Sequence, residues 1–321
     1  MLWGPAILSF VVAFVALRLL IGPLARFALD HPNERSLHER PVPRTGGLAI
    51  LAGVAALLPA TPPALWLLLL LAFVLAAISL LDDLRGLPTL ARLAAHALAA
   101  AVLVWQVAGP IHPLALLLLV LGLTWIVNLY NFMDGSDGLA GGMALIGFGS
   151  YALAAHSAGG GALAALCLAL AGAAGAFLVH NFPPARIFLG DVGSIPLGFL
   201  AGALGVMGWR EGFWPLWFPV LVFGPFIGDA TLTLLRRLAR RERVWQAHRE
   251  HYYQRLVRMG FGHRGTALIA YAVMAACGAA ALFARTQPLI IQVLAFLAAA
   301  AGLAVIAAWV DMRWSQFGRA A

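Results

Sequence analysis

Apolar runs, each about long enough to cross a lipid bilayer, follow one another along most of the 321-residue chain. Stretches of about 17–25 apolar residues are typical of membrane-spanning helices, because only a helix or a closed barrel pairs every backbone polar group inside hydrocarbon. The runs are continuous rather than alternating, which excludes a transmembrane β-barrel. Charged residues make up only 11% of the chain, against about 25% in soluble domains, so lipid must form part of the solvent. The sequence therefore predicts one all-α, polytopic membrane domain over residues 1–321.

Short connections separate the predicted spans. The span at 47–60 is short, so it is either bent or merged with its neighbour, and about 10–11 transmembrane helices are expected. Residues 1–17 carry no charge that could form the basic region of a removable signal peptide, so we expect the first helix to be retained. The spans are expected near residues 2–24, 47–60, 64–81, 91–108, 113–131, 139–156, 162–180, 195–209, 214–235, 266–284 and 288–310.

The charges fall mainly on one set of connections. Counted by alternation of the spans, 18 of the 21 arginines lie on one side; Arg210 and Arg285 lie on the other, and Arg18 lies within the first span. The positive-inside rule places the arginine-rich side in the cytoplasm. This orientation predicts an outer N-terminus and, with eleven spans, an inner C-terminus. The cytoplasmic loops are expected at about 25–47, 82–91, 128–141, 181–194 and 236–265.

Six aspartates from four places in the sequence lie at or near this same side. One interpretation is that each caps a helix or neutralises a nearby arginine. Acidic groups near membrane depth are costly and tend to mark functional sites, and glycine adjoins several of these, so convergence on one cation and phosphate site is the favoured interpretation. The six are Asp82, Asp83, Asp134, Asp137, Asp191 and Asp229.

The stretch NLYNFMDGSDGLAGG at 128–142 shows the pattern most clearly. If helical, Asp134 and Asp137 would share a face, since residues three apart are neighbours on a helix. A helix beginning near Gly138 would direct backbone N–H groups at an anion. An EF-hand calcium loop needs a glutamate at its twelfth position, and none is present. Hard oxygen ligands beside phosphate favour Mg²⁺, with Mn²⁺ as a second candidate.

The loop at 236–264 contains nine arginines, together with His248 and His251 three residues apart. A solvated basic surface is the simplest interpretation of such a loop. The chain has no lysine, which fits either arginine-rich codon usage or a need for the bidentate phosphate contacts that arginine makes. The histidine pair followed by two tyrosines favours contact with a substrate. A nucleic acid is not expected as a partner, because the aspartates on the same side would repel its backbone. An anionic lipid headgroup or a nucleotide diphosphate fits better.

Five motifs, in this order, resemble those of the polyprenyl-phosphate N-acetylhexosamine-1-phosphate transferases, over most of the chain. They read RSLHERPVPRTGG, LDDLRGL, NLYNFMDGSDGLAGG, NFPPARIFLGDVGS and HREHYYQRL. The resemblance implies transfer of a sugar 1-phosphate from a UDP-N-acetylhexosamine to undecaprenyl phosphate, with release of UMP, in the bacterial inner membrane. The histidine motif differs from the H-x-H-H of many members and looks like the branch that initiates O-antigen synthesis, which argues against a muramoyl-pentapeptide substrate.

The resemblance also implies roles for individual residues. Asp82, Asp83 and Asp134 would be catalytic, with Asp82 as base or phosphate positioner. The metal would bind Asp191, with Asp134 or Asp137. The nucleotide sugar would contact Asn131, Asp134, Asn181, Phe188, His248 and His251, with Phe188 stacking on uracil. The phosphates would contact Arg44, Arg92 and Arg249.

Several alternatives stay open at this point. Asp82 could instead form a helix-end ion pair with Arg85. The sequence does not choose between direct transfer and a covalent aspartyl-phosphate intermediate. A polytopic lipid or solute transporter is a rival function, although the interiors of the spans are nearly uncharged. A scaffold subunit of an export complex would explain the hydrophobicity but not the aspartates. A homodimer is compatible with the sequence.

Overall fold

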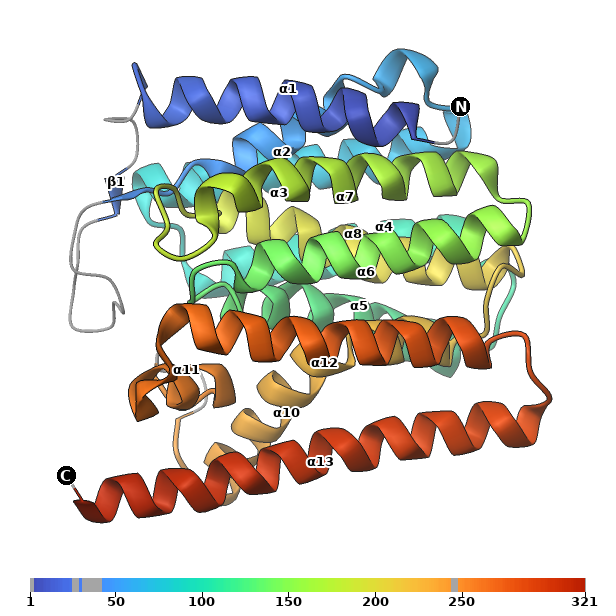
Figure 1. The fold of residues 1–321 in the computed structure, drawn as a ribbon. Coiled ribbons are helices and arrows are strands. Elements are labelled where there is room, and N and C mark those ends of the chain that lie inside the picture. The colour runs from blue at the N-terminus through green and yellow to red at the C-terminus, as the bar shows by residue number, and fades with distance from the viewer. Residues whose placement is uncertain (1–2, 25–28, 31–41, 244–247, 321) are drawn as a thin grey trace.

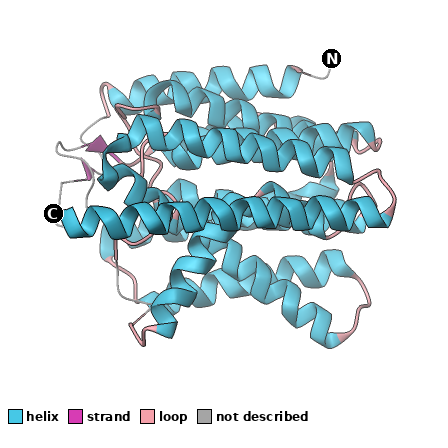
Figure 2. Cartoon of the chain, turned by 60° about the horizontal axis from the view of Figure 1, so that its bottom comes forward, coloured by secondary structure: helices cyan, strands magenta, loops and turns pink. Residues whose placement is uncertain are grey.

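The helices of the protein run side by side in a single bundle, in a computed structural model that describes residues 3–24, 29–30, 42–243 and 248–320 (Figures 1 and 2). Within the part of the chain that the model describes, nine helices are long and apolar enough to cross a membrane. This confirms the prediction of an all-α, multi-pass membrane protein.

The helical elements, in chain order, are α1 (Gly4–Ile21), α2 (Gly46–Ala55), η1 (Leu58–Ala60), η2 (Pro63–Leu65), α3 (Trp66–Arg85), α4 (Thr89–Ala108), α5 (Pro113–Phe132), α6 (Leu139–Ser157), α7 (Gly161–Asn181), α8 (Asp191–Arg210), α9 (Trp217–Val222), α10 (Gly224–Ala239), α11 (Tyr252–Leu256), η3 (Val257–Phe261), α12 (Gly262–Ala284) and α13 (Leu289–Ala320). Two short strands, β1 (Leu29–Asp30) and β2 (Val42–Pro43), pair antiparallel beside the end of α1.

Two of the predicted spans differ from simple transmembrane helices. The span expected at 47–60 is the ten-residue α2 followed by a short 3₁₀ turn. The single span expected at 214–235 is wrong: α9 ends at Val222 and α10 begins at Gly224, with Pro225 in its first turn. Proline lacks the N–H that would continue the ladder of α9, so a helix breaks there and restarts. Among the described residues, nine helices are long enough to span a membrane, fewer than the 10–11 expected, because α2, α9 and α10 are each shorter than a span.

The middle of the bundle is formed by α6, α7 and α8. Protein buries 89% of the most apolar window of α8 but none of that of α13, so α8 is central and α13 lies at the edge. Small residues allow this close packing, as is usual between membrane helices. A Cβ added to Gly172 of α7 would lie 2.2 Å from the carbonyl oxygen of Ala6 in α1. The central helices therefore give a rigid base to the loops at their ends.

The described parts of the loops predicted to be cytoplasmic gather at one end of the bundle (left in Figure 1). The turns that follow α3, α5 and α7 lie there, together with β1, α11 and the C-terminus, whereas the N-terminus lies at the opposite end. The segments that carry the candidate site residues therefore lie at one end of the bundle.

Candidate active site

The turn between α3 and α4 brings Asp82 and Arg92 together. Gly86 adopts a left-handed backbone conformation (φ 67°), which ends α3 and reverses the chain. One carboxylate oxygen of Asp82 accepts a hydrogen bond from the backbone N–H of Leu87 at 2.6 Å, and the other accepts one from Arg92 Nη1 at 2.8 Å. The helix-end ion pair of Asp82 is therefore formed with Arg92 rather than with Arg85.

Asp191 is the first residue of α8 and lies next to this pair. Its Oδ1 accepts a hydrogen bond from Asn131 Nδ2 at 2.8 Å, and its Oδ2 lies 3.8 Å from Arg92 Nη1. Asn131 also donates to Ser194 Oγ at 2.9 Å, one turn further along α8. One network of polar side chains thus connects α3, α4, α5 and α8. It consists of Asp82, Arg92, Asn131 and Asp191.

Asp134 is half-buried in the turn after α5. Burial raises the pKa of its carboxyl well above the usual range; the negative charge of Asp191 raises it further, and a hydrogen bond from the backbone N–H of Gly190 acts in the opposite direction. Two carboxylates that repel each other in a half-buried site are stabilised by a cation between them. The Asp134–Asp191 pair therefore suits a hard divalent metal.

Among the described residues, no group of three or more His, Cys, Asp or Glu side chains is arranged to hold a metal. Mg²⁺ typically binds proteins through one or two carboxylates and completes its shell with water and substrate phosphates. Two carboxylates, Asp134 and Asp191, match that requirement.

Asp137 points to different partners. Its Oδ2 accepts a hydrogen bond from the backbone N–H of Ala185 at 2.9 Å, and its Oδ1 lies 3.6 Å from His263 Nδ1. The segment between α5 and α6 is not helical, so Asp134 and Asp137 do not share a helix face as the sequence suggested. Asp137 joins its own loop to the loop after α7 and to the start of α12.

Asn181, the last residue of α7, braces two loops from a buried position. Its Oδ1 accepts a hydrogen bond from the N–H of Gly138 at 2.8 Å, and its Nδ2 donates to the carbonyl oxygen of Ile187 at 2.9 Å. The N–H of Leu139 donates to the carbonyl oxygen of Ser136, so the N–H groups of Gly138 and Leu139 at the start of α6 have protein partners. Asn181 therefore acts on the site through the backbone of the two loops.

The segment before Asp191 is fixed by the start of α2. The backbone N–H of Phe188 donates to Pro43 at 2.7 Å, its carbonyl accepts from Gly46 at 2.9 Å, and the side chain is half-buried. Arg44 Nη2 lies 3.5 Å from Asp83 Oδ1, so two further predicted site residues form an ion pair. The predicted phosphate ligand Arg44 and the α3 aspartates thus lie at the same end.

The predicted histidine pair sits at the start of α11. His251 is 4% exposed, and its Nδ1 lies 3.0 Å from Asp229 Oδ1 of α10. The carboxylate of Asp229 also accepts the N–H groups of Tyr252 and Tyr253, both at 3.0 Å, and thereby caps α11. The rings of His248 and His251 lie 4.9 Å apart, and burial lowers the pKa of His248 to about 4, with a further contribution from His251.

Arg249, the third predicted phosphate ligand, is half-buried and makes no ion pair with the described acids. Three contacts were not expected from the sequence: Ser194 on Asn131, His263 on the loop of Asp137, and Tyr253, whose hydroxyl donates to the carbonyl of Phe132 at 3.1 Å. Ser194 could have been inferred, since it lies one helical turn after Asp191 at the start of α8. The other two depend on tertiary packing alone.

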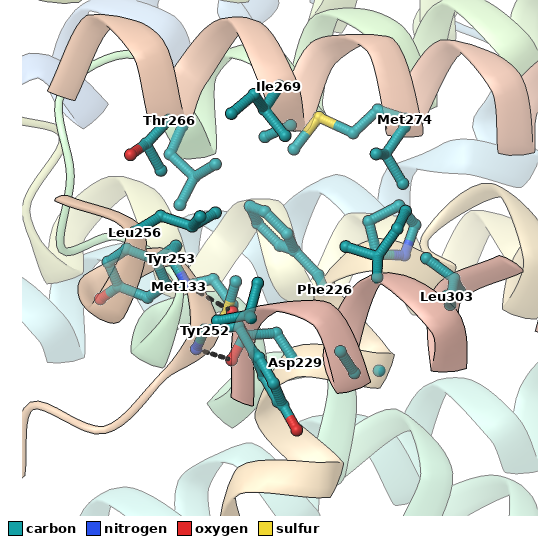
Figure 3. A pocket seen from close by; sticks show the side chains of 18 of the residues that line it. Met133, Phe226, Asp229, Tyr252, Tyr253, Leu256, Thr266, Ile269, Met274 and Leu303 are labelled. Carbon is teal, nitrogen blue, oxygen red and sulfur yellow. Dashed lines mark hydrogen bonds between the residues drawn. The ribbon is translucent and has the colours of Figure 1, made fainter. Parts of the chain in front are cut away.

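An apolar cavity of about 100 Å³ opens between α10, α12 and α13 (Figure 3). Phe226, Ile269 and Met274 are among the apolar residues that line it, and Asp229 and Tyr253 lie at one end. The cavity therefore connects a hydrocarbon-like interior with the polar residues around α11.

Known proteins resemble this chain over most of its length. The family model of glycosyl transferase family 4 matches residues 65–209. The probable undecaprenyl-phosphate N-acetylglucosaminyl 1-phosphate transferase of Bacillus subtilis is 28% identical, over 83% of this chain and 81% of its own. The decaprenyl-phosphate N-acetylglucosaminephosphotransferase of Mycobacterium leprae is 34% identical, over 78% of this chain and 76% of its own.

A phospho-N-acetylmuramoyl-pentapeptide-transferase of Moorella thermoacetica is 43% identical over a shorter part, 31% of this chain and 30% of its own. The family model begins at the start of α3 and ends in the last turn of α8, and so contains the network around Asp82, Asn131 and Asp191. The chain belongs to glycosyl transferase family 4, the polyprenyl-phosphate N-acetylhexosamine-1-phosphate transferases.

Proposed function

We propose that the protein transfers N-acetylhexosamine 1-phosphate from a UDP-sugar to undecaprenyl phosphate, releasing UMP. The product would be the first lipid-linked intermediate of O-antigen or of a related cell-envelope glycan. The observation that carries this proposal is the network in which Asp191 contacts Asn131 and Arg92, and Arg92 in turn contacts Asp82. The two relatives that match over most of the chain are named as N-acetylglucosamine phosphate transferases, so UDP-N-acetylglucosamine is the first donor to test.

The proposed reaction forms one P–O bond and breaks another. An oxygen of the lipid phosphate attacks the phosphorus attached to the sugar. The bond between that phosphorus and the bridging oxygen breaks, and UMP leaves with the bridging oxygen. Such transfers depend mainly on positioning and on neutralising charge. Asp134 and Asp191 would hold Mg²⁺, which when bound offsets the negative charge of the diphosphate.

The remaining residues would position the two substrates. Arg92 is held by Asp82 at 2.8 Å and lies 3.8 Å from Asp191, so its positive charge is directed to the place where phosphates would meet the carboxylate pair. The acceptor lipid is a phosphate monoester, whose second pKa is about 6, so its phosphate is largely deprotonated at neutral pH. The attack therefore needs no strong base, and Asp82 fits the role of positioner better than that of base.

The acceptor's hydrocarbon tail would lie in the membrane, with its phosphate at the loop end. The cavity between α10, α12 and α13 offers an apolar path that ends at Asp229 and Tyr253. We infer that it accommodates part of the polyprenyl chain, which supports a lipid acceptor. The arginine-rich loops at the same end support a site that faces the cytoplasm from the inner membrane.

The test measures UMP release by the purified protein in lipid nanodiscs. Undecaprenyl phosphate, Mg²⁺ and a panel of UDP-N-acetylhexosamines are supplied, and each is omitted in turn. We expect UMP only when the lipid and one particular sugar are both present, and a loss of at least about a hundredfold in Asp191→Asn. Glu211→Gln, an exposed acid at the opposite end, is the matched control and should retain full activity. Absence of UMP with every donor, from folded protein, would refute the proposal.

A further inference from the structure

The long helix α13 reaches the site end of the molecule beyond the apolar part that was expected to span the membrane. Asp311, near its C-terminal end, receives donors from two other elements. Its Oδ1 pairs with Nη1 of Arg236 in α10 at 2.5 Å and with Nη1 of Arg255 in α11 at 2.9 Å. The hydroxyl of Tyr252 donates to its Oδ2 at 3.4 Å. One carboxylate therefore joins α10, α11 and α13.

The two guanidinium groups that Asp311 binds also pack on the same aromatic ring. The Cζ atoms of Arg236 and Arg255 each lie 5.3 Å from the ring centroid of Tyr252, within the range of cation–π attraction. Arg255 is only 6% exposed, so its charge must be paired to be tolerated. Removing the negative charge of Asp311 would leave this buried cation dependent on Glu250, at 3.9 Å.

The element held in this way is short. α11 has five residues, fewer than an isolated helix needs, so its place is set by its tertiary contacts. Asp229 fixes its first N–H groups, and Asp311 fixes the side chains of Tyr252 and Arg255. α11 is therefore held by one carboxylate at its N-terminal N–H groups and by a second at its side chains.

From α11 the contacts continue to the carboxylate pair. The hydroxyl of Tyr253 donates to the carbonyl of Phe132, at the end of α5. A Cβ at Gly135 would lie 2.1 Å from that hydroxyl, so Tyr253 packs directly against the turn that contains Asp134. A displacement of α11 would remove this support from Asp134.

We propose that Asp311 is a positioning residue for the transfer reaction: by binding Arg236, Arg255 and Tyr252 it holds α11 against the turn that carries Asp134. Asp311 acts through α11 and does not contact the substrates. Its effect on the rate rests on the function proposed above, whereas its effect on α11 does not.

The kinetic test compares Asp311→Asn with the wild type in the UMP assay. We expect kcat to fall by about tenfold or more, as for other charge-assisted hydrogen bonds, and KM for the UDP-sugar to stay within about twofold. Asp311→Glu keeps the charge and should restore most of kcat, and Glu211→Gln should match the wild type. Unchanged kcat in Asp311→Asn, or an equal loss in the glutamate variant, would overturn the proposal.

The structural test is backbone hydrogen exchange, which does not need activity. In Asp311→Asn we expect the amides of residues 251–256 and 132–138 to exchange at least about tenfold faster, while those of α8 are unchanged. Unchanged exchange in both segments would refute the proposal that Asp311 holds α11 in place. A wild type that is inactive with every donor would defeat the proposed function but leave this measurement valid.

A second variant guards against misfolding of the first. Asp311 makes two ion pairs, and Arg236→Gln removes the one with Arg236, whose side chain is 41% exposed. Amide exchange in α11 should therefore become faster, but less so than in Asp311→Asn. In the double variant with Asp311→Asn the added effect of Arg236→Gln should largely vanish, because the partner is already absent. Additive effects would show that Asp311 does not act through this contact.

Discussion

The start of α2 and the start of α8 approach each other so closely that one methyl group should disturb the site. A Cβ added to Gly47 would lie 2.3 Å from both Cα and N of Gly193, which is two residues after Asp191. Contacting carbon atoms prefer a separation of about 3.5–4.0 Å, so Gly47→Ala forces the two backbones apart by about 1–2 Å. The hydrogen bond from the N–H of Gly47 to Leu189, now 2.9 Å long, would be stretched at the same time.

The expected result is a folded but poorly active protein. Overpacking of this kind costs about 1–3 kcal/mol of stability. A displacement of about 1 Å at reacting groups costs roughly a hundredfold in rate, so turnover should fall by about that factor. Turnover is measured as UMP release, and the thermal midpoint is recorded on the same preparation.

Gly149→Ala in α6 provides the matched control. A Cβ there meets no atom within 4 Å, and alanine is favoured over glycine inside a helix by about 1 kcal/mol. Activity should therefore be unchanged and stability equal or higher. If Gly47→Ala kept turnover near that of the wild type, the close approach of α2 and α8 would not set the position of Asp191.

Three further outcomes are expected. Removing divalent cations with a chelator should abolish UMP release, Mg²⁺ should restore it, and Asp191→Asn should need at least about tenfold more Mg²⁺, as measured by titration. Burial lowers the pKa of His248 to about 4, against 6.5 when exposed, so between these pH values only the unfolded state gains a proton. The free energy of unfolding should therefore fall as the pH drops from about 6.5 to 4. Thermal unfolding of His248→Gln should show a weaker dependence on pH. Ala270→Phe fills the apolar cavity and should raise KM for undecaprenyl phosphate about tenfold without changing KM for the UDP-sugar, which initial-rate kinetics would show.

The long membrane-spanning helices could be predicted from the sequence because the bilayer imposes a simple rule on every span. A helix in hydrocarbon needs an apolar surface on all sides, so a run such as that of α3 is visible without any knowledge of its neighbours. The end of the bundle that carries the site followed from where the arginines and aspartates lie. These features depend on local composition alone.

The break between α9 and α10 was missed, although the sequence contains its cause. Pro225 follows Gly224, and a helix usually ends before the residue that precedes a proline. The apolar character continues through the break because both pieces lie within the bundle. The continuous hydrophobicity therefore led to the prediction of one helix, although the proline indicated that the helix ends there.

The partner of Asp82 could not be chosen from sequence distance. Arg85 lies three residues away, as neighbours on a helix do, whereas Arg92 lies in the next helix. The left-handed conformation of Gly86 ends α3 and turns the chain, which brings Arg92 back to Asp82 and leaves Arg85 exposed. The same limit applies to His251 and Asp229, which are 22 residues apart and meet only after α10 and α11 have packed.

The side-chain amide of Asn181 holds the loop that follows α5 and the loop that precedes α8 together. Because one buried group bonds both loops, the conformational entropy of ordering the segments that carry Asp134 and Asp191 is lost when the chain folds rather than when a ligand binds. A preorganised pair of this kind favours rigid ligands, which lose little freedom of their own on binding. Stiff mimics of the diphosphate in the proposed donor should therefore inhibit the proposed transfer better than flexible ones of equal charge.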